Sequence, residues 1–237
     1  MTTKTDEDLF KMNYCGNAEN RKQMLIDFNV SVASFEELLV GHSINSYATG
    51  ERKIENNFMI LNVIDSINNK TYQPVFSETV ARVMFRNTDI EIPRKMTVYS
   101  NSNHHADHYN GRATRQIPHE SRRTSANAQL ISLIELSRAL MLFKVDNPKP
   151  MDGVFKKIYD DLNKYPGSDP FPYKIKSINT ALGKYIESHG TTNGFHHLND
   201  FIDYIQGTCK TKKINRFDFE ILRAMFSAEY PSEKIYF

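Results

Sequence analysis

The sequence has few of the features that assign a protein to a class directly. Only two of its 237 residues are cysteines, Cys15 and Cys209, and they form no CxxC pair, which excludes a disulfide framework and fits a reducing compartment. Glycine is scarce, at ten residues, and no GxGxxG or phosphate-loop pattern occurs, so a nucleotide-binding fold is disfavoured. The longest uncharged apolar run, ALMLF at 139–143, is far shorter than the roughly 18 residues of a membrane span. The acidic start MTTKTDEDLF is unlike a signal peptide. We therefore expect a soluble, cytoplasmic protein with no membrane partner.

The charge of the chain is unevenly distributed. Residues 1–90 carry nine Lys/Arg against twelve Asp/Glu, whereas residues 94–124 carry six against two. Four of the eight histidines fall in this second window: His104, His105, His108 and His119. Its positive potential should grow below about pH 6.5, where unperturbed histidine becomes protonated. The middle of the chain therefore favours an anionic partner.

The first ninety residues predict short helices. SFEELLV at 34–40 contains a Ser-x-x-Glu capping box. In residues 51–68, apolar side chains recur at three- and four-residue steps, as on one face of a helix. SETVARVMF at 77–85 predicts a further helix capped by Ser77.

From Asn87 to Thr124 the helical periodicity is absent, although Met96–Tyr99 alternates enough to permit a short strand or hairpin. Loops longer than about 12 to 15 residues are usually functional or disordered. This window is therefore the first candidate for a functional segment.

The helical signal returns after Thr124. TSANAQLISLIELSRALMLFKV at 124–145 is apolar around most of its circumference and predicts a central buried helix. Further helices are expected at 151–165, 173–190, 198–207 and 216–230. FHHLND at 195–200 is interpreted as a helix cap region in which Asn199 or Asp200 serves the backbone. The apolar KIYF at 234–237 is expected to pack onto its own lobe or onto a neighbouring subunit.

These patterns predict a mainly α protein with two helical lobes joined by a basic, irregular middle segment that permits a short β-hairpin. The expected boundaries are an N-terminal helical lobe at 1–90, a basic irregular connection at 91–124 and a C-terminal helical lobe at 125–237.

The preferred interpretation of the basic window is a surface for single-stranded nucleic acid, with RNA as the expected form. Lysine and arginine neutralise phosphates, and tyrosine rings such as those of Tyr99 and Tyr109 can stack on unpaired bases. A second basic tract, CKTKKINR, follows at 209–216. The candidate nucleic-acid-binding residues are Arg94, Lys95, Arg112, Arg115, Arg122, Arg123, Lys210, Lys212 and Lys213.

The same window also permits a metal site. NHHADHYNG at 103–111 resembles the HxHxDHxGG loop of the metallo-β-lactamase-fold hydrolases, with His105, Asp107 and His108 in ligand positions. Asn103 stands where that loop has its first histidine, and Asn110 where it has its first glycine. The resemblance implies zinc and a metal-activated water. That family is an αβ/βα sandwich, whereas the rest of this chain predicts helices.

Two interpretations without nucleic acid or metal stay open. The window can be a solvated loop whose charges serve solubility, or the protein can be an interaction module that docks through its apolar C-terminus. We expect single-stranded nucleic-acid binding with self-assembly into a homo-oligomer, as in a viral nucleocapsid or coat protein. This favours a binding protein without cofactor over an enzyme, and the zinc-dependent hydrolase is the enzymatic alternative.

Overall fold

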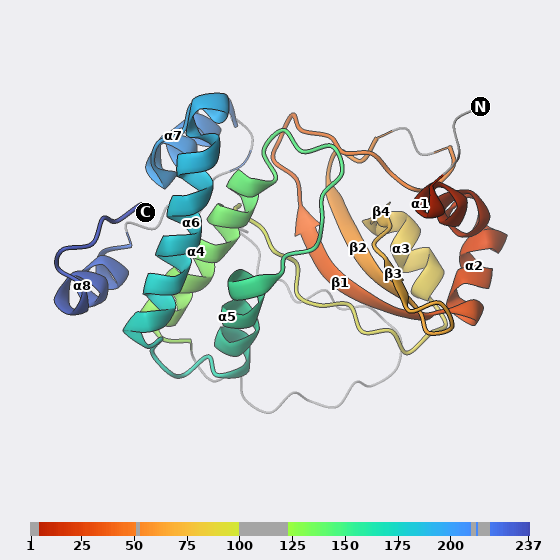
Figure 1. The fold of residues 1–237 in the computed structure, drawn as a ribbon, viewed down its shortest axis with the longest axis horizontal. Coiled ribbons are helices and arrows are strands. Elements are labelled where there is room, and N and C mark those ends of the chain that lie inside the picture. Colours follow the sequence, from red (N-terminus) through yellow and green to blue (C-terminus); the bar gives the residue numbers. More distant parts are fainter. Residues whose placement is uncertain (1–4, 51–52, 100–122, 210–211, 213–218) are drawn as a thin grey trace. The chain divides into compact units, whose positions relative to one another are not determined.

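The computed structural model describes residues 5–50, 53–99, 123–209, 212 and 219–237. This part of the chain contains eight α-helices, a π-helical turn and one four-stranded sheet (Figure 1). The expected predominance of helix is confirmed. The chain divides into two compact units: Met1–Thr97 with Met141–Met151 form the first unit, and Val98–Leu140 with Asp152–Phe237 form the second unit. No helix of the described ranges has the length and apolar character needed to cross a membrane.

The first unit combines a sheet with short helices. Its elements are α1 (Asp6–Phe10), the π-helical turn η1 (Lys11–Cys15), α2 (Ala18–Asp27), β1 (Asn29–Glu37), β2 (Asn57–Asp65), β3 (Lys70–Tyr72), β4 (Val75–Ser77) and α3 (Glu78–Phe85).

Strand β2 is the centre of this sheet. It pairs antiparallel with β1 along one edge and with β3 and β4 along the other. The helix predicted for residues 51–68 is therefore wrong. Met59 and Leu61 are buried in one core cluster and Phe58 and Ile60 in another. A strand buried on both faces is apolar at nearly every position, so helical spacing can be found in it by chance.

Strand β1 replaces the capped helix predicted at 34–40. Phe35 pairs with Met59 across the sheet, and the register shifts between Val32 and Ser34. The Ser34 hydroxyl is buried and finds no hydrogen-bond partner among the described residues, so it caps no helix. Pairing with the long strand β2 outweighs the local capping preference here.

The segment around Met96 adds to the sheet through a bridge to β1. Met96 N donates to Phe35 O at 2.9 Å, and Glu37 N donates to Met96 O at 3.0 Å. Together these bonds form a single parallel bridge between Met96 and Glu36. Within residues 96–99, Met96 and Tyr99 each form a bridge, and the partner of Met96 is Glu36 of β1.

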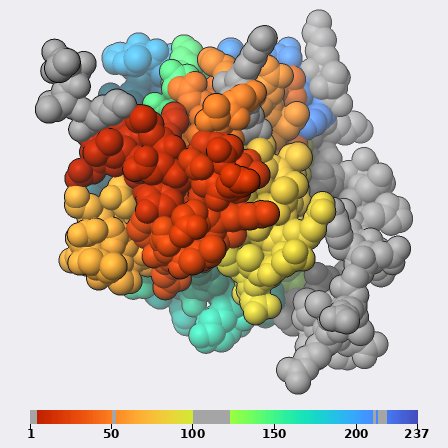
Figure 2. All heavy atoms as spheres, turned by 90° about the vertical axis from the view of Figure 1, so that its right-hand side faces the viewer, coloured from red at the N-terminus to blue at the C-terminus, as the bar shows by residue number. Residues whose placement is uncertain are grey.

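Helices α1 to α3 share a core with the sheet. Phe10, Met24 and Phe85 from these helices are buried in the same cluster as Met59 and Phe76 of the strands. Figure 2 shows the N-terminal residues (red), which include α1 and α2, on the surface of this unit. The predicted helix at 77–85 is confirmed as α3, because the Ser77 hydroxyl accepts from Val80 N at 3.3 Å.

The second unit is helical in its described residues. Its elements are α4 (Ser125–Met141), α5 (Gly153–Lys164), α6 (Pro172–Asn193), α7 (Leu198–Thr208) and α8 (Glu220–Glu229). The predicted central helix is confirmed, since most of α4 is buried, including Ser132, Glu135 and Ser137. Tyr159 OH of α5 donates to Glu135 Oε1 at 3.2 Å, and Tyr185 OH of α6 donates to Leu140 O at 3.3 Å. Helix α4 therefore contacts both α5 and α6.

The predicted cap in FHHLND is also confirmed. Asp200 Oδ2 accepts from the backbone N–H groups of His196 and His197 at 2.9 and 2.8 Å. His197 Nδ1 accepts in turn from Asn199 N at 3.1 Å. Helix α7 thus begins with a reciprocal capping box.

The KIYF segment packs onto its own unit. Phe237 is fully buried against the rings of Phe219 and Phe226. The side chain of Asn179 holds the backbone: its Nδ2 donates to Lys234 O at 2.8 Å and its Oδ1 accepts from Tyr236 N at 2.9 Å. This confirms the first of the two placements expected from the sequence.

Candidate nucleic-acid interface

The two candidate residues of the first unit differ in their surroundings. Arg94 is exposed. Lys95 Nζ lies 3.4 Å from Glu37 Oε2, and that carboxylate also accepts from Thr97 Oγ1 at 2.8 Å. Since Lys95 is half-buried and paired, Arg94 is the more accessible charge for a phosphate.

Arg123 is the first described residue after Tyr99, and its guanidinium points into its own unit. Nη1 donates to Asn127 Oδ1 at 2.7 Å and to Leu162 O at 3.4 Å, and Nη2 donates to Asn163 Oδ1 at 3.0 Å. Arg123 therefore joins the start of α4 to the end of α5.

Lys212 and Tyr99 bring two distant parts of the sequence together. Lys212 is exposed, and its Nζ lies 4.7 Å from the centroid of the Tyr99 ring, a favourable cation–π distance. Tyr99 is only 4% exposed. The ring expected to stack on a base is thus buried, and it supports a lysine of the second basic tract.

Several predicted site residues lie outside the described residues: Arg112, Arg115, Arg122, Lys210 and Lys213, and the metal candidates His105, Asp107 and His108. Among the described side chains, no group of three or more His, Cys, Asp or Glu could hold a metal ion.

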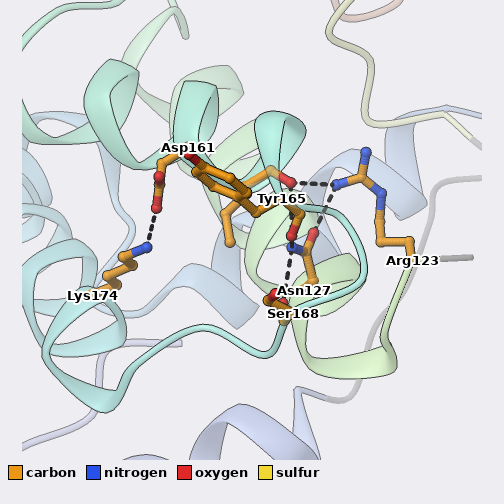
Figure 3. Close-up of polar contacts among 7 residues, drawn as sticks. Arg123, Asn127, Asp161, Tyr165, Ser168 and Lys174 are labelled. Carbon is orange, nitrogen blue, oxygen red and sulfur yellow. Dashed lines mark hydrogen bonds and ion pairs between the residues drawn. The ribbon is translucent and has the colours of Figure 1, made fainter. Parts of the chain in front are cut away.

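The connection between α5 and α6 is held in place by one buried amide, that of Asn127 (Figure 3). Its Nδ2 lies 3.3 Å from the carbonyl oxygens of Leu162, Tyr165 and Ser168. In a continuing helix, the N–H of residue 166 would donate to the Leu162 carbonyl. Residue 166 is a proline and has no N–H, so this carbonyl needs another donor. Asn127 therefore caps the end of α5 and fixes the loop that follows.

Three aromatic side chains on this connection face solvent. Tyr165, Phe171 and Tyr173 are 52%, 63% and 57% exposed. All three line a pocket of about 350 Å³, together with Asn127 and Leu162. The rings of Phe171 and Tyr173 are stacked, with centroids 5.8 Å apart and planes 13° from parallel. Single exposed apolar residues are ordinary, but a cluster at one pocket indicates a binding surface.

Lysine ammonium groups lie over two of these rings. Lys164 Nζ is 5.3 Å from the centroid of Tyr165, and Lys174 Nζ is 5.7 Å from that of Phe171. Lys174 also forms an ion pair with Asp161, drawn in Figure 3. Its charge is therefore neutralised within the pocket, while its position over the ring is fixed.

This pocket was not predicted from the sequence, although the sequence contains a signal for it. YPGSDPFPY at 165–173 contains three prolines and a glycine between aromatic residues. Proline and glycine interrupt helices, so aromatic side chains among them cannot all join a helical core. Only the helices on either side of the connection were predicted.

A second pocket, of about 320 Å³, lies in the first unit and is polar. Tyr47 OH donates to Glu7 Oε1 at 2.6 Å, and Lys11 Nζ lies 4.7 Å from the Tyr47 ring centroid. Burial, followed by the bond to Glu7, raises the pKa of Tyr47 well above its ordinary value. The phenol stays protonated at neutral pH and acts as a donor, so it offers no general base.

Comparisons with protein-family models, with curated proteins and with solved structures each gave no match. Function is therefore inferred from the residues and contacts described above.

Proposed function

We propose that the protein binds single-stranded nucleic acid, with RNA as the expected ligand, through basic residues of the second unit and its adjoining segments. The observation that carries this proposal is the contact between Lys212 and Tyr99. Tyr99 lies in the basic window that also contains Arg112, Arg115 and Arg122, and Lys212 lies within the tract CKTKKINR.

This contact joins two basic tracts that are more than a hundred residues apart in the sequence. Lys210 and Lys213 are sequence neighbours of Lys212. In this proposal, basic residues of both tracts neutralise phosphates of the strand and release counterions, which supplies most of the affinity for single strands.

Two of the candidate residues take a different role in this proposal. Arg123 and Lys95 are engaged by protein oxygens, so they position the chain and do not serve as the main phosphate ligands. The proposed phosphate ligands are Arg94, Arg112, Arg115, Arg122, Lys210, Lys212 and Lys213.

A charge-neutralisation experiment tests the proposal. The variant Lys210→Gln/Lys212→Gln/Lys213→Gln is titrated with a labelled, unstructured RNA at several salt concentrations. Each phosphate contact contributes about −0.7 to the slope of log affinity against log salt for single strands, so loss of three contacts should flatten the slope by about 2.

The matched control removes three exposed lysines elsewhere, as Lys22→Gln/Lys53→Gln/Lys157→Gln. It changes the net charge equally and should leave the slope near that of the unmodified protein. Equal slopes for both triple variants would show that the second tract does not contact the phosphates.

Self-assembly, as in a viral nucleocapsid or coat protein, belongs to the same proposal. The packing of KIYF onto its own unit leaves this segment occupied, so assembly would use other surfaces. The particle mass of purified protein at low and high salt tests it. Particles much larger than the 27.4 kDa chain that dissociate at high salt are expected, and a monomer at both concentrations would exclude assembly.

A further inference from the structure

The pocket on the α5–α6 connection has no part in the phosphate contacts proposed above. From its geometry we infer that the pocket formed by Tyr165, Phe171 and Tyr173 stacks one unpaired base of the bound strand. This inference rests on the proposed function and names the part of the ligand that the second unit recognises.

The shape of the pocket suits a flat, largely apolar ring. Phe171 and Tyr173 present a stacked pair of rings, each more than half exposed, and proteins bind unpaired bases on aromatic platforms of this kind. Its volume of about 350 Å³ lies within the range of ligand pockets. A base paired within a duplex has no free face, so only an unstacked base of a single strand can use it.

The platform is rigid before the ligand arrives. Asn127 holds the carbonyls of Leu162, Tyr165 and Ser168, and Pro170 and Pro172 flank Phe171 with fixed φ angles. A preformed site loses less conformational entropy on binding than a flexible one.

The charges at the pocket favour a base over a phosphate. Asp161 neutralises Lys174, and a second carboxylate, that of the exposed Asp169, also lines the pocket. Lys164 lies over the Tyr165 ring but does not line the pocket. A phosphate there would meet a carboxylate, whereas the exocyclic amino group of a base can donate to it. Aspartate accepts from cytosine N4 in known base recognition. The pocket should therefore prefer cytosine, which has an amino group at C4, over uracil, which has a carbonyl oxygen there.

The test compares aromatic variants in the full-length protein. Phe171→Leu/Tyr173→Leu keeps apolar side chains but removes the ring faces, and should weaken binding of an oligocytidylate of about 12 nucleotides. Loss of one stacked base corresponds to about 5- to 140-fold in affinity. The single variant Phe171→Trp keeps an aromatic ring at this position and should bind like the unmodified protein. Both positions are exposed, so circular-dichroism melting curves should stay unchanged and show that the variants fold.

Tyr204→Leu is the matched control, because Tyr204 is an aromatic residue of α7 that is 42% exposed and does not line the pocket. It should not change the affinity. A second comparison uses an oligouridylate of equal length: the unmodified protein should prefer the oligocytidylate by about tenfold, and Asp169→Asn should reduce that preference.

The outcomes separate this inference from the proposed function. If the double leucine variant binds oligocytidylate with unchanged affinity and the same salt dependence, the stacking pocket is wrong and phosphate binding stands. If the unmodified protein binds neither oligonucleotide at low salt, both are wrong.

Discussion

Replacing Asn127 should destabilise the second unit, because a single amide caps α5 and holds the loop beyond it. Asn127 is fully buried, accepts from Arg123 and faces three carbonyl oxygens at 3.3 Å with its Nδ2. An amide nitrogen has two hydrogens, so it supplies about two full bonds shared among three acceptors.

The expected cost follows from these bonds. Asn127→Ala removes both Nδ2 donors and the acceptor of Arg123. It leaves the Leu162 carbonyl with only the 3.4 Å bond from Arg123 Nη1, since Pro166 has no N–H, and removes the Nδ2 bond of the Ser168 carbonyl. A buried acceptor left without its partner costs about 1–3 kcal/mol, and the Tyr165 carbonyl keeps a bond from Ser168 N. We therefore expect the free energy of unfolding to fall by about 2–3 kcal/mol.

Asn127→Asp gives the sharper test. The carboxylate can still accept from Arg123, but its second oxygen would face the carbonyl oxygens that Nδ2 now serves. Burying a charge against acceptors costs more than leaving a neutral group unpaired, so this variant should lose more than about 3 kcal/mol.

The assay is urea unfolding followed by circular dichroism, with Gln129→Ala as control. Gln129 lies two residues further along α4 and accepts one bond, from Leu222 N at 3.3 Å, so its loss should cost about 0.5–1.5 kcal/mol. An Asn127→Asp variant as stable as Gln129→Ala would refute the capping role.

Three further predictions concern other parts of the molecule. Gly183→Ala would place a Cβ 2.5 Å from the Tyr236 ring and should lower the free energy of unfolding by about 1–2 kcal/mol. The Cβ of Gly207→Ala in α7 would meet nothing within 4 Å, so this variant should gain up to about 1 kcal/mol. Thermal melts in which both variants are more stable than the unmodified protein would contradict the docked KIYF segment. Burial lowers the pKa of His42, with Lys144 adding to it, and burial also lowers the pKa of His197 against the opposing charge of Asp200. Below about pH 6.5 the unfolded chain therefore binds protons that the folded chain does not. The contribution of these two histidines to the free energy of unfolding is full above about pH 6.5 and falls as the pH drops below it. Urea midpoints that rise on acidification would contradict this direction. Burial raises the pKa of the Cys15 thiol to about 12, so a thiol reagent should modify Cys209 first and Cys15 only on unfolding, and rapid labelling of both cysteines in native protein would disprove this.

The elements predicted correctly have signals that lie within a few residues of one another. Ser77 caps α3 through Val80, and Asp200 caps α7 through His196 and His197. Helix α4 was predicted because it is apolar around most of its circumference. Each of these signals lies within the local sequence, so a single sequence is enough to detect it.

The elements predicted wrongly depend on partners far away in the sequence. Residues 34–40 have a helix-capping pattern, yet Phe35 pairs with Met59 in β2. A pattern of neighbouring residues cannot predict a pairing with a distant strand. The candidate site divides in the same way. The accessible charges of Arg94 and Lys212 were predicted, while the internal bonds of Arg123 and the burial of Tyr99 arise from contacts between separate elements. The aromatic pocket depends on Asn127, a residue from another helix that holds the loop in place.

The most direct test of nucleic-acid binding uses protein freed of bound nucleic acid at high salt. It is titrated with an unstructured labelled RNA and with a duplex of the same length, between about 50 and 200 mM salt. We expect tighter binding of the single strand at every salt concentration, and log affinity should fall steeply and linearly with log salt concentration. Equal or tighter binding of the duplex, or no salt-dependent binding of either, would contradict it.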